Sequence, residues 1–295
     1  MPPEHWQGTL WLAADFAILH GAAGVTATHA HYAHQLMLST GAPFTAELDG
    51  SVHTAQRLLV ASLRPHAILT APAPMLTIYA EPQRLPASAL LAALDGVAPP
   101  GAHSPVSLDG LASALLAQPR QALPDPRLQR ALEQVDALLS GKVSAAAVAE
   151  AAHLSLSQLE RLFSAKLGLP VRQLVLWRRL RLAIRGILLG NTLTHAAHGA
   201  GFADAAHFSR TMRSLFGVRA DRSLRQLTVK LIDLWARASL AAARARARPL
   251  PRGTARSIAP RRQQGNQDGC RCPGRRPSCG NRARRNACPA NGPSR

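Results

Sequence analysis

The chain has 295 residues, of which 47% are hydrophobic and only 4% aromatic. This length and composition are typical of a soluble protein with two ordinary domains. The sequence has no run of about eighteen apolar residues, the length of a membrane span. No cationic segment of the kind that begins a secretory signal precedes the first apolar run. We therefore expect a cytoplasmic protein with no membrane partner.

The charge is unevenly distributed along the chain. The formal net charge is +19 overall. Residues 1–125 hold 4 lysines and arginines against 8 acidic residues, residues 126–230 hold 16 against 6, and residues 231–295 hold 15 against 2. Basic surfaces attract polyanions such as nucleic acids. A nucleic-acid surface is therefore expected after residue 125 and not in the mildly acidic first part.

The first 80 residues predict a small antiparallel β-barrel. Short apolar runs such as TLWLA, HQLMLST and MLTIYA alternate with Gly, Pro, Thr and Ser at strand-like spacing. Two alanine- and leucine-rich runs, at 87–96 and 108–118, predict helices. The proline-rich stretch that follows cannot continue a helix. We therefore predict a domain over residues 1–117 and a linker over 118–126.

Residues 127–228 predict an all-α domain. Proline nearly disappears there, and apolar residues recur every three or four positions. In the clearest helix, Gly190 is expected to mark the end, and one stripe holds Leu174, Trp177, Leu180, Ile184 and Ile187. Residues 229–295 form a basic extension with too few large apolar residues, for most of its length, to offset the entropy of ordering. It is predicted to be largely disordered.

The helical domain contains a repeat. The segment Leu159-Glu160-Arg161-Leu162-Phe163, followed by Gly168, recurs 49 residues later as Phe208-Ser209-Arg210-Thr211-Met212, followed by Gly217. Each copy follows a short alanine-rich segment, which predicts two helix-turn-helix units. The stripes expected to pack inward are Leu156, Leu159 and Phe163 in the first unit and Phe208, Met212, Leu215 and Phe216 in the second.

The opposite face of each repeated helix is polar and carries one arginine. Such a face suits the DNA major groove, where arginine can contact guanine and a small side chain can touch a thymine methyl group. For a single helix, a solvated arginine on an ordinary helical bundle is the simpler interpretation. The duplication and the basic charge of residues 126–230 favour a pair of DNA-reading helices.

Residues 127–219 resemble the DNA-binding domain of the AraC/XylS family of bacterial transcription regulators. The resemblance lies in Ala196-Ala197, Gly201-Phe202, Phe208-Ser209-Arg210 and Phe216-Gly217. It implies a regulator without enzymatic activity that binds promoter DNA as a monomer or homodimer, with two helix-turn-helix motifs joined by a linker helix and RNA polymerase as a further partner. Ala196 replaces an isoleucine that is buried in the family, so we expect the second unit to be underpacked.

The resemblance also implies which residues meet DNA. Base-reading positions fall on Ser157, Glu160 and Arg161 in the first unit and on Ala205, Ala206, His207 and Arg210 in the second. Gln158 lies on the same polar face as the first set. Helix N-termini and the nearby hydroxyl groups of Ser155 and Thr194 are expected to contact phosphates, which position the protein without reading sequence.

A histidine motif lies in the first domain. His29-x-His31-x3-Gln35, with His66 farther along, resembles the metal motif of cupin barrels, in which glutamate usually occupies the glutamine position. Such barrels are common sensory domains of this regulator family. Two histidines at i and i+2 on a strand could share a divalent metal with a third. We expect instead that His29, His31, His34 and His66 line a pocket for an unknown small-molecule effector, and we assign no metal and no cofactor.

Two other functional classes stay open. A cupin-type metal-binding enzyme with a helical appendage would need the histidines to hold a metal. A nonspecific nucleic-acid-binding protein would depend on the basic tail. The four cysteines, all within that tail, lack the C-x2-C pairing typical of zinc modules: Cys270, Cys272, Cys279 and Cys288.

Overall fold

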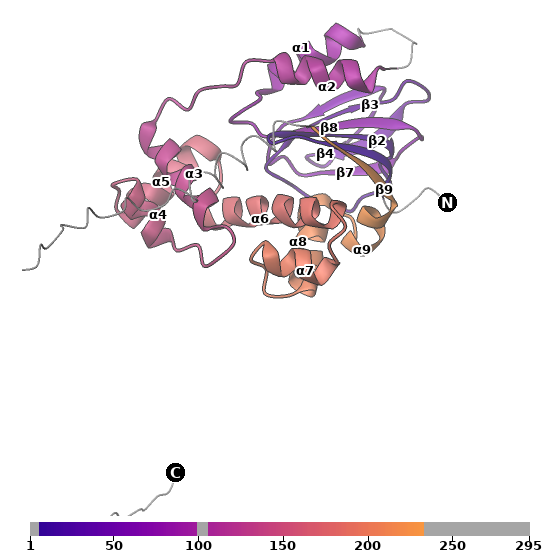
Figure 1. The fold of residues 1–295 in the computed structure, drawn as a ribbon. Helices are drawn as coiled ribbons and strands as arrows, with labels where there is room; N and C mark the ends of the chain where they lie inside the picture. Colours follow the sequence, from indigo (N-terminus) through magenta and orange to yellow (C-terminus); the bar gives the residue numbers. More distant parts are fainter. Residues whose placement is uncertain (1–5, 99–105, 233–295) are drawn as a thin grey trace, which may run out of the picture. The chain divides into compact units, whose positions relative to one another are not determined.

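The computed structural model describes residues 6–98 and 106–232. Strands come first and helices follow, which is the α+β order that the sequence predicts (Figure 1). Most of the predicted basic extension, from residue 233 onward, lies outside the described residues. None of the helices within the described ranges has both the length and the apolar character of a membrane span.

The described residues contain two β-sheets. The larger sheet has the strand order β6-β3-β8-β2-β1-β9, and the smaller has the order β5-β4-β7. All paired neighbours run antiparallel except β1 and β9, which are parallel. The strands are β1 (Gln7–Leu12), β2 (Phe16–Ala22), β3 (His34–Leu38), β4 (Phe44–Leu48), β5 (Ser51–Ala55), β6 (Arg57–Val60), β7 (His66–Thr70), β8 (Met75–Ala80) and β9 (Leu227–Leu231).

The larger sheet is buried on both faces because side chains alternate along each strand. On β1, Trp11 packs with α1 (Ala87–Val97) and α2 (Leu108–Ala117), whereas Leu10 packs with the helices that follow residue 125. The same alternation on β8 packs Ile78 with α1 and α2, whereas Tyr79 packs with the helices that follow residue 125. Figure 1 shows α1 and α2 on one side of the sheet and α6 (Val171–Leu188) along the other.

Two strands were not predicted from the sequence. β5 is exposed along most of its length and lacks an apolar stripe, so only its pairing with β4 across the Asp49-Gly50 turn makes it a strand. β9 covers residues that the sequence assigns to the end of the helical domain and the start of the extension. It is the parallel edge strand beside β1, a pairing between segments more than 200 residues apart.

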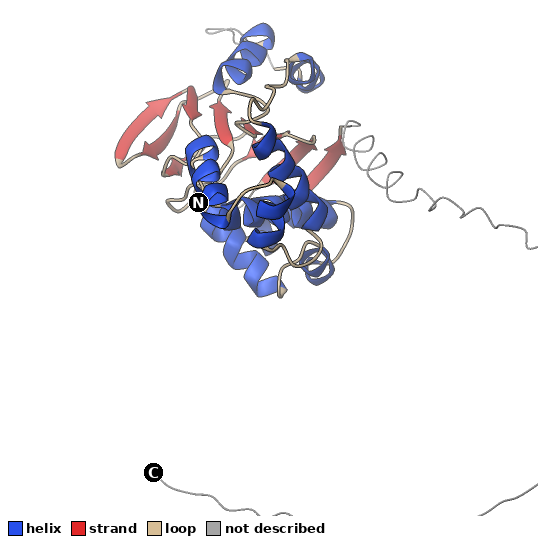
Figure 2. Cartoon of the chain, turned by 90° about the vertical axis from the view of Figure 1, so that its left-hand side faces the viewer, coloured by secondary structure: helices blue, strands red, loops and turns tan. Residues whose placement is uncertain are grey.

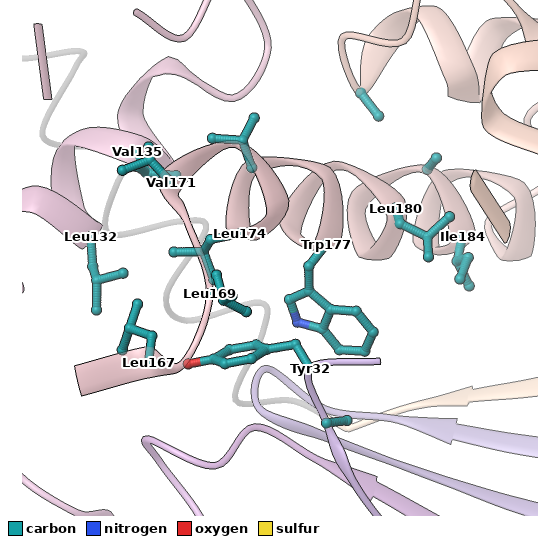
Figure 3. Packing of buried hydrophobic residues seen from close by; sticks show 14 of the residues in the cluster. Tyr32, Leu132, Val135, Leu167, Leu169, Val171, Leu174, Trp177, Leu180 and Ile184 are labelled. Atoms are coloured by element: carbon teal, nitrogen blue, oxygen red, sulfur yellow. The ribbon is translucent and has the colours of Figure 1, made fainter. Parts of the chain in front are cut away.

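The helical part begins where Asp125 caps the helix that starts at Pro126. Its helices are α3 (Pro126–Leu138), α4 (Ala145–Ala151), α5 (Leu156–Leu167), α6, α7 (Leu193–Gly199), α8 (Ala205–Phe216) and α9 (Ala220–Ser223), with a short 3-10 turn over Leu224–Gln226. The predicted stripe of α6 packs inward, and Figure 3 shows Leu174, Trp177 and Leu180 on it. Gly190 follows the end of α6 with a positive φ of 95°.

One hydrophobic core joins the sheet to the helices. Trp177 of α6 and Tyr32, which precedes β3, are both almost fully buried, with ring centroids 6.3 Å apart (Figure 3). The same cluster contains Trp6 and Leu10 from the β-domain and the buried side chains of both helix-turn-helix units. Figure 2 shows α1 and α2 apart from the other helices, with strands between the two groups. The sheet and the helices therefore pack together within one compact unit.

Candidate nucleic-acid interface

The first helix-turn-helix unit consists of α4 and α5. Val148 and Ala149 of α4 are buried, as are Leu159 and Phe163 of α5. The turn between the helices passes through His153 at a φ of 55°, a conformation that few non-glycine residues adopt. The two helices are therefore short and closely packed, as the alanine-rich sequence predicts.

Ser155 fixes the start of α5. Its hydroxyl accepts a hydrogen bond from the backbone N–H of Gln158, and the Gln158 side-chain oxygen accepts one from the backbone N–H of Ser155. This reciprocal pair is a capping box, which satisfies two amide groups at the helix end. The Ser155 hydroxyl and the Gln158 carbonyl oxygen therefore have structural roles in addition to any contact with DNA.

The predicted polar face of α5 is exposed to solvent. Ser157, Glu160 and Arg161 all lie on it. Leu156 differs from its prediction, because it does not pack inward and its exposed fraction is 53%. It occupies the first turn of α5, on the exposed side of that turn. The sequence pattern misplaced it because one apolar residue at a helix start fits either face.

The second unit consists of α7 and α8. Thr192 caps α7 by accepting a hydrogen bond from the N–H of His195, whereas Thr194 is exposed in the first turn and is not the cap. Asp204 caps α8 by accepting from the N–H of His207. That hydrogen bond is the main reason why the pKa of Asp204 is lowered.

The predicted DNA-facing residues of α8 differ in exposure. Ala206 and Arg210 are exposed, whereas Ala205 and His207 are half-buried. The ring of His207 packs edge-on against Phe202, with ring centroids 5.1 Å apart. We infer that Arg210 and Ala206 are free to meet a partner and that His207 has a packing role as well.

The second unit is well packed despite its small residues. Ala196 has an exposed fraction of 5%, and a Cβ atom added at Gly186 of α6 would lie 3.2 Å from the Ala196 Cβ. Helix α6 therefore approaches α7 closely enough to replace the volume of the isoleucine that the resemblance leads one to expect. The expected underpacking is therefore not seen at Ala196.

The two units present matching features. Arg161 and Arg210 are both exposed in the second turn of their helices, and the caps Ser155 and Asp204 share their 49-residue offset. Both helices end at a glycine in the left-handed conformation, Gly168 at a φ of 73° and Gly217 at 68°. Two structurally equivalent polar helix faces are thus joined by the single helix α6.

Comparison with known proteins identifies this arrangement. Residues 148–226 match the family model of a helix-turn-helix domain. The chain carries a helix-turn-helix domain. A solved regulator with an AraC-type DNA-binding domain, from Chromobacterium violaceum, is 27% identical over 34% of this chain and 91% of its own, with a TM-score of 0.33. ToxT from Vibrio cholerae is 10% identical over 72% of this chain and 99% of its own, with a TM-score of 0.47. No curated protein matches the sequence.

The helix-turn-helix domain is joined to the sheet by a buried ionic cluster. Glu81, just after β8, has an exposed fraction of 3%. One carboxylate oxygen accepts hydrogen bonds from Nε1 of Trp177, at 3.2 Å, and from the guanidinium of Arg181. The other oxygen lies 3.2 Å from Nη2 of Arg178. All three partners lie on α6, so the carboxylate fixes this helix against the β-domain.

The ionic cluster also determines the charge state of Glu81. Burial alone would raise the pKa of Glu81. The positive charges of Arg178 and Arg181, together with the hydrogen bonds from Trp177 and Arg181, outweigh burial, and the net pKa is lowered. Glu81 is therefore ionised at neutral pH. No sequence motif indicated this residue, because its partners lie about 100 positions away.

The second unit of the helix-turn-helix domain also touches the β-domain directly. Phe216, the last residue of α8, packs with Trp6, Tyr79 and Trp177, with ring centroids 5.3, 5.5 and 5.8 Å away. The next residue, Gly217, accepts a hydrogen bond at its carbonyl from the N–H of Ala27. The end of a predicted DNA-reading helix thus lies against the β-domain.

The structure brings together three of the four predicted ligand-pocket histidines. His29, His31 and His66 are buried together beside Gln35, with one ring nitrogen of each within 4.8 Å of the others. His34 is separate, and its Nδ1 accepts a hydrogen bond from the N–H of Ser62. Because neighbouring residues on a strand point to opposite faces, His34 faces away when Gln35 of β3 faces the cluster.

Burial keeps the clustered histidines neutral. It is the main cause that lowers the pKa of His29 to about 4 and that of His31 to about 3, and it also lowers the pKa of His66. Repulsion from neighbouring histidines adds to the shifts of His29 and His31. At neutral pH each ring therefore has one N–H group and one lone pair.

Proposed function

We propose that the chain is a sequence-specific transcription regulator that reads two successive major grooves with α5 and α8. The observation that carries this proposal is the equivalent placement of Arg161 and Arg210 on two exposed helix faces joined by one helix. At 18 residues, α6 is about 27 Å long, and successive major grooves lie about 34 Å apart. A linker helix of this length is compatible with placing the two units in successive grooves on one face of a DNA duplex.

We also propose that the β-domain modulates this binding in response to an effector. The support is the contact between the domains, because both α6, through Glu81, and α8, through Phe216, touch the β-domain. A shift in the β-domain that moved either helix would change the spacing or tilt of the two DNA-reading faces. Reading of two adjacent grooves is sensitive to such a shift because both helices must fit at once.

Selection of bound duplexes from a random pool tests the DNA-reading proposal. We expect enrichment of a site with two short conserved blocks about one helical turn apart. A protein that lacks residues 248–295 should enrich the same site, with a weaker dependence on salt because fewer phosphates are neutralised. An unenriched pool, or loss of all binding when the tail is removed, would favour nonspecific nucleic-acid binding instead.

We expect Arg161→Ala to weaken binding to the best site by about 1–3 kcal/mol and to relax base choice at one position. The reason is the loss of a two-pronged contact to guanine. Competition binding with all four bases at that position provides the measurement. Arg57→Ala, on β6 of the β-domain, is the matched control and should leave affinity unchanged. An equal loss on unrelated duplexes would reassign Arg161 to a phosphate contact.

Leu156 is a further DNA-contact candidate, because an exposed apolar side chain beside a polar reading face can touch a thymine methyl group. We expect Leu156→Ala to change the free energy of unfolding by less than about 0.5 kcal/mol. Replacing the contacted thymine by deoxyuracil should weaken wild-type binding by about 1 kcal/mol and leave the variant unaffected. If both proteins respond equally to loss of the methyl group, Leu156 does not contact it.

A further inference from the structure

Arg179 lies near the middle of α6, between the two helix-turn-helix units. Figure 1 shows α3, α4 and α5 toward one end of α6 and α7 and α8 toward the other. Nη2 of Arg179 donates a hydrogen bond of 2.6 Å to the carbonyl oxygen of Gly141. Gly141 lies in the connection from α3 to α4, which leads into the first unit. Arg179 therefore links α6 to the entry of that unit.

The turn of the second unit meets the same guanidinium group. Gly201 lies between α7 and α8 with a φ of 82°. A Cβ atom added there would lie 2.8 Å from Nε of Arg179 and 2.8 Å from the carbonyl oxygen of Leu139, at the end of α3. Both distances are too short for a real Cβ atom. The turn of the second unit, the guanidinium group and the end of α3 are therefore in direct contact.

The stability of the fold alone does not account for an arginine at this place. The side chain is half-buried, and burial lowers the pKa of Arg179 because it disfavours the charged form. Nε is buried and has no hydrogen-bond partner among the residues that the structure describes. A buried donor without a partner opposes folding, and an apolar side chain of similar length would avoid that cost. The contacts of Arg179 with both units point to a positioning role instead.

Two units attached to one helix can still turn relative to each other about the axis of that helix. A side chain that contacts both units away from the axis restricts this rotation. The relative rotation matters for DNA, because one extra base pair between two half-sites moves them apart by about 3.4 Å and turns them by about 35°. A pair of units held in one orientation can therefore fit only one spacing.

We propose that Arg179 is a positioning residue that holds the two units in one relative orientation and so restricts binding to DNA sites with one spacing between the half-sites. The statement about DNA rests on the reading function proposed above. The statement about orientation concerns the protein alone and is tested without DNA.

Distance measurement by pulsed electron paramagnetic resonance tests the orientation. The protein is the full chain with its four tail cysteines replaced by serine. Spin labels are attached through Ser164→Cys on α5 and Ser214→Cys on α8, both at exposed positions. We expect a narrow distance distribution in this parent and a broader one in Arg179→Met, which keeps the apolar stem but has no donor for Gly141. Arg179→Lys keeps a donor and should resemble the parent.

A second loss variant guards against a change in folding. Arg179→Ala removes the guanidinium group with most of the stem and should broaden the distribution as Arg179→Met does. Circular dichroism establishes that each variant is folded. A distribution in folded Arg179→Met or Arg179→Ala as narrow as that of the parent overturns the positioning role.

Competition binding then tests the spacing. The probes are the selected duplex and versions with one base pair inserted or removed between its two blocks. We expect altered spacing to weaken binding of the parent and of Arg179→Lys by about tenfold or more, and of Arg179→Met by about threefold or less. Arg172→Ala, at an exposed arginine in the first turn of α6, is the matched control and should keep the parent's ratio between the duplexes.

The ratio between duplexes separates positioning from stability. A general loss of stability would weaken binding to all duplexes by one factor and leave the ratio unchanged. If Arg179→Met broadens the distance distribution but keeps the parent's ratio, the link from orientation to spacing is overturned. If the protein selects no duplex, the proposed function fails, while the distance measurement still decides whether Arg179 holds the two units.

Discussion

Replacing Glu81 with alanine is expected to lower the free energy of unfolding by about 3 kcal/mol. The substitution removes the carboxylate that accepts a hydrogen bond from Arg181 and pairs with Arg178, and it leaves the indole N–H of Trp177 without its acceptor. The side chains of Arg181 and Arg178 are 13% and 21% exposed, so water can partly solvate the charges that lose their partner. We therefore expect a loss at the lower end of the roughly 3–5 kcal/mol that breaking a buried ion pair costs. Urea denaturation of both proteins provides the measurement.

Two further variants separate the ion pairs from general packing. Glu47→Ala, at a half-buried glutamate on β4 for which the described residues provide no ion pair, should cost about 0.5 kcal/mol or less. The triple variant Glu81→Leu, Arg178→Leu and Arg181→Leu should recover much of the lost stability, because it removes Glu81 together with both arginines that pair with it and leaves only the half-exposed Asp136, which pairs with Arg178. If Glu81→Ala costs no more than Glu47→Ala, the ionic cluster does not hold α6 to the β-domain.

The same carboxylate gives the stability a pH dependence of known sign. The pKa of Glu81 is lower in the folded protein than its ordinary value of 4.5. The contribution of Glu81 to the free energy of unfolding is therefore fully present at pH values above its ordinary pKa. It is lost as the pH falls through the lower pKa of the folded protein. Stability curves of the wild type and of Glu81→Ala should converge in acid.

The sequence predicted most of the helical part because its signals are local. The stripe on α6, the glycines that end α5 and α8, and the arginines at equivalent positions depend on spacings within a few turns. His34 was grouped with the other histidines, although the two-residue period of a strand puts it on the opposite face from Gln35. The error at Leu156 is also local, since a single residue at a helix start has too few neighbours to define its face.

Contacts between distant segments could not be predicted in this way. Glu81 meets Arg181 across 100 positions, and β9 pairs with β1 across more than 200. Nothing in the local pattern around Glu81 distinguishes it from a surface glutamate. The coupling between the two domains depends on such contacts, so the regulatory part of the site became visible only in the folded chain.

Phe216→Ala is expected to lower the free energy of unfolding by about 3–5 kcal/mol, measured by urea denaturation. The ring is 6% exposed and contacts Trp6, Tyr79 and Trp177, so truncation leaves a cavity among aromatic side chains and removes edge-to-face contacts with two of them. Phe163→Ala should cost a similar amount, because Phe163 is 0% exposed in the core of the first unit. A loss near 1 kcal/mol for Phe216→Ala would mean that α8 does not dock on the β-domain in solution.

The milder pair Phe216→Leu and Phe163→Leu then separates stability from coupling. Both keep an apolar side chain and should retain the fold and the preference for the selected duplex. Of these two residues only Phe216 lies between α8 and the β-domain, so only Phe216→Leu should loosen the placement of α8 and lower the affinity for the selected duplex, measured by competition binding. An equal reduction in both variants would mean that the affinity follows overall stability. An unchanged affinity in Phe216→Leu would mean that its packing does not position α8 for DNA binding.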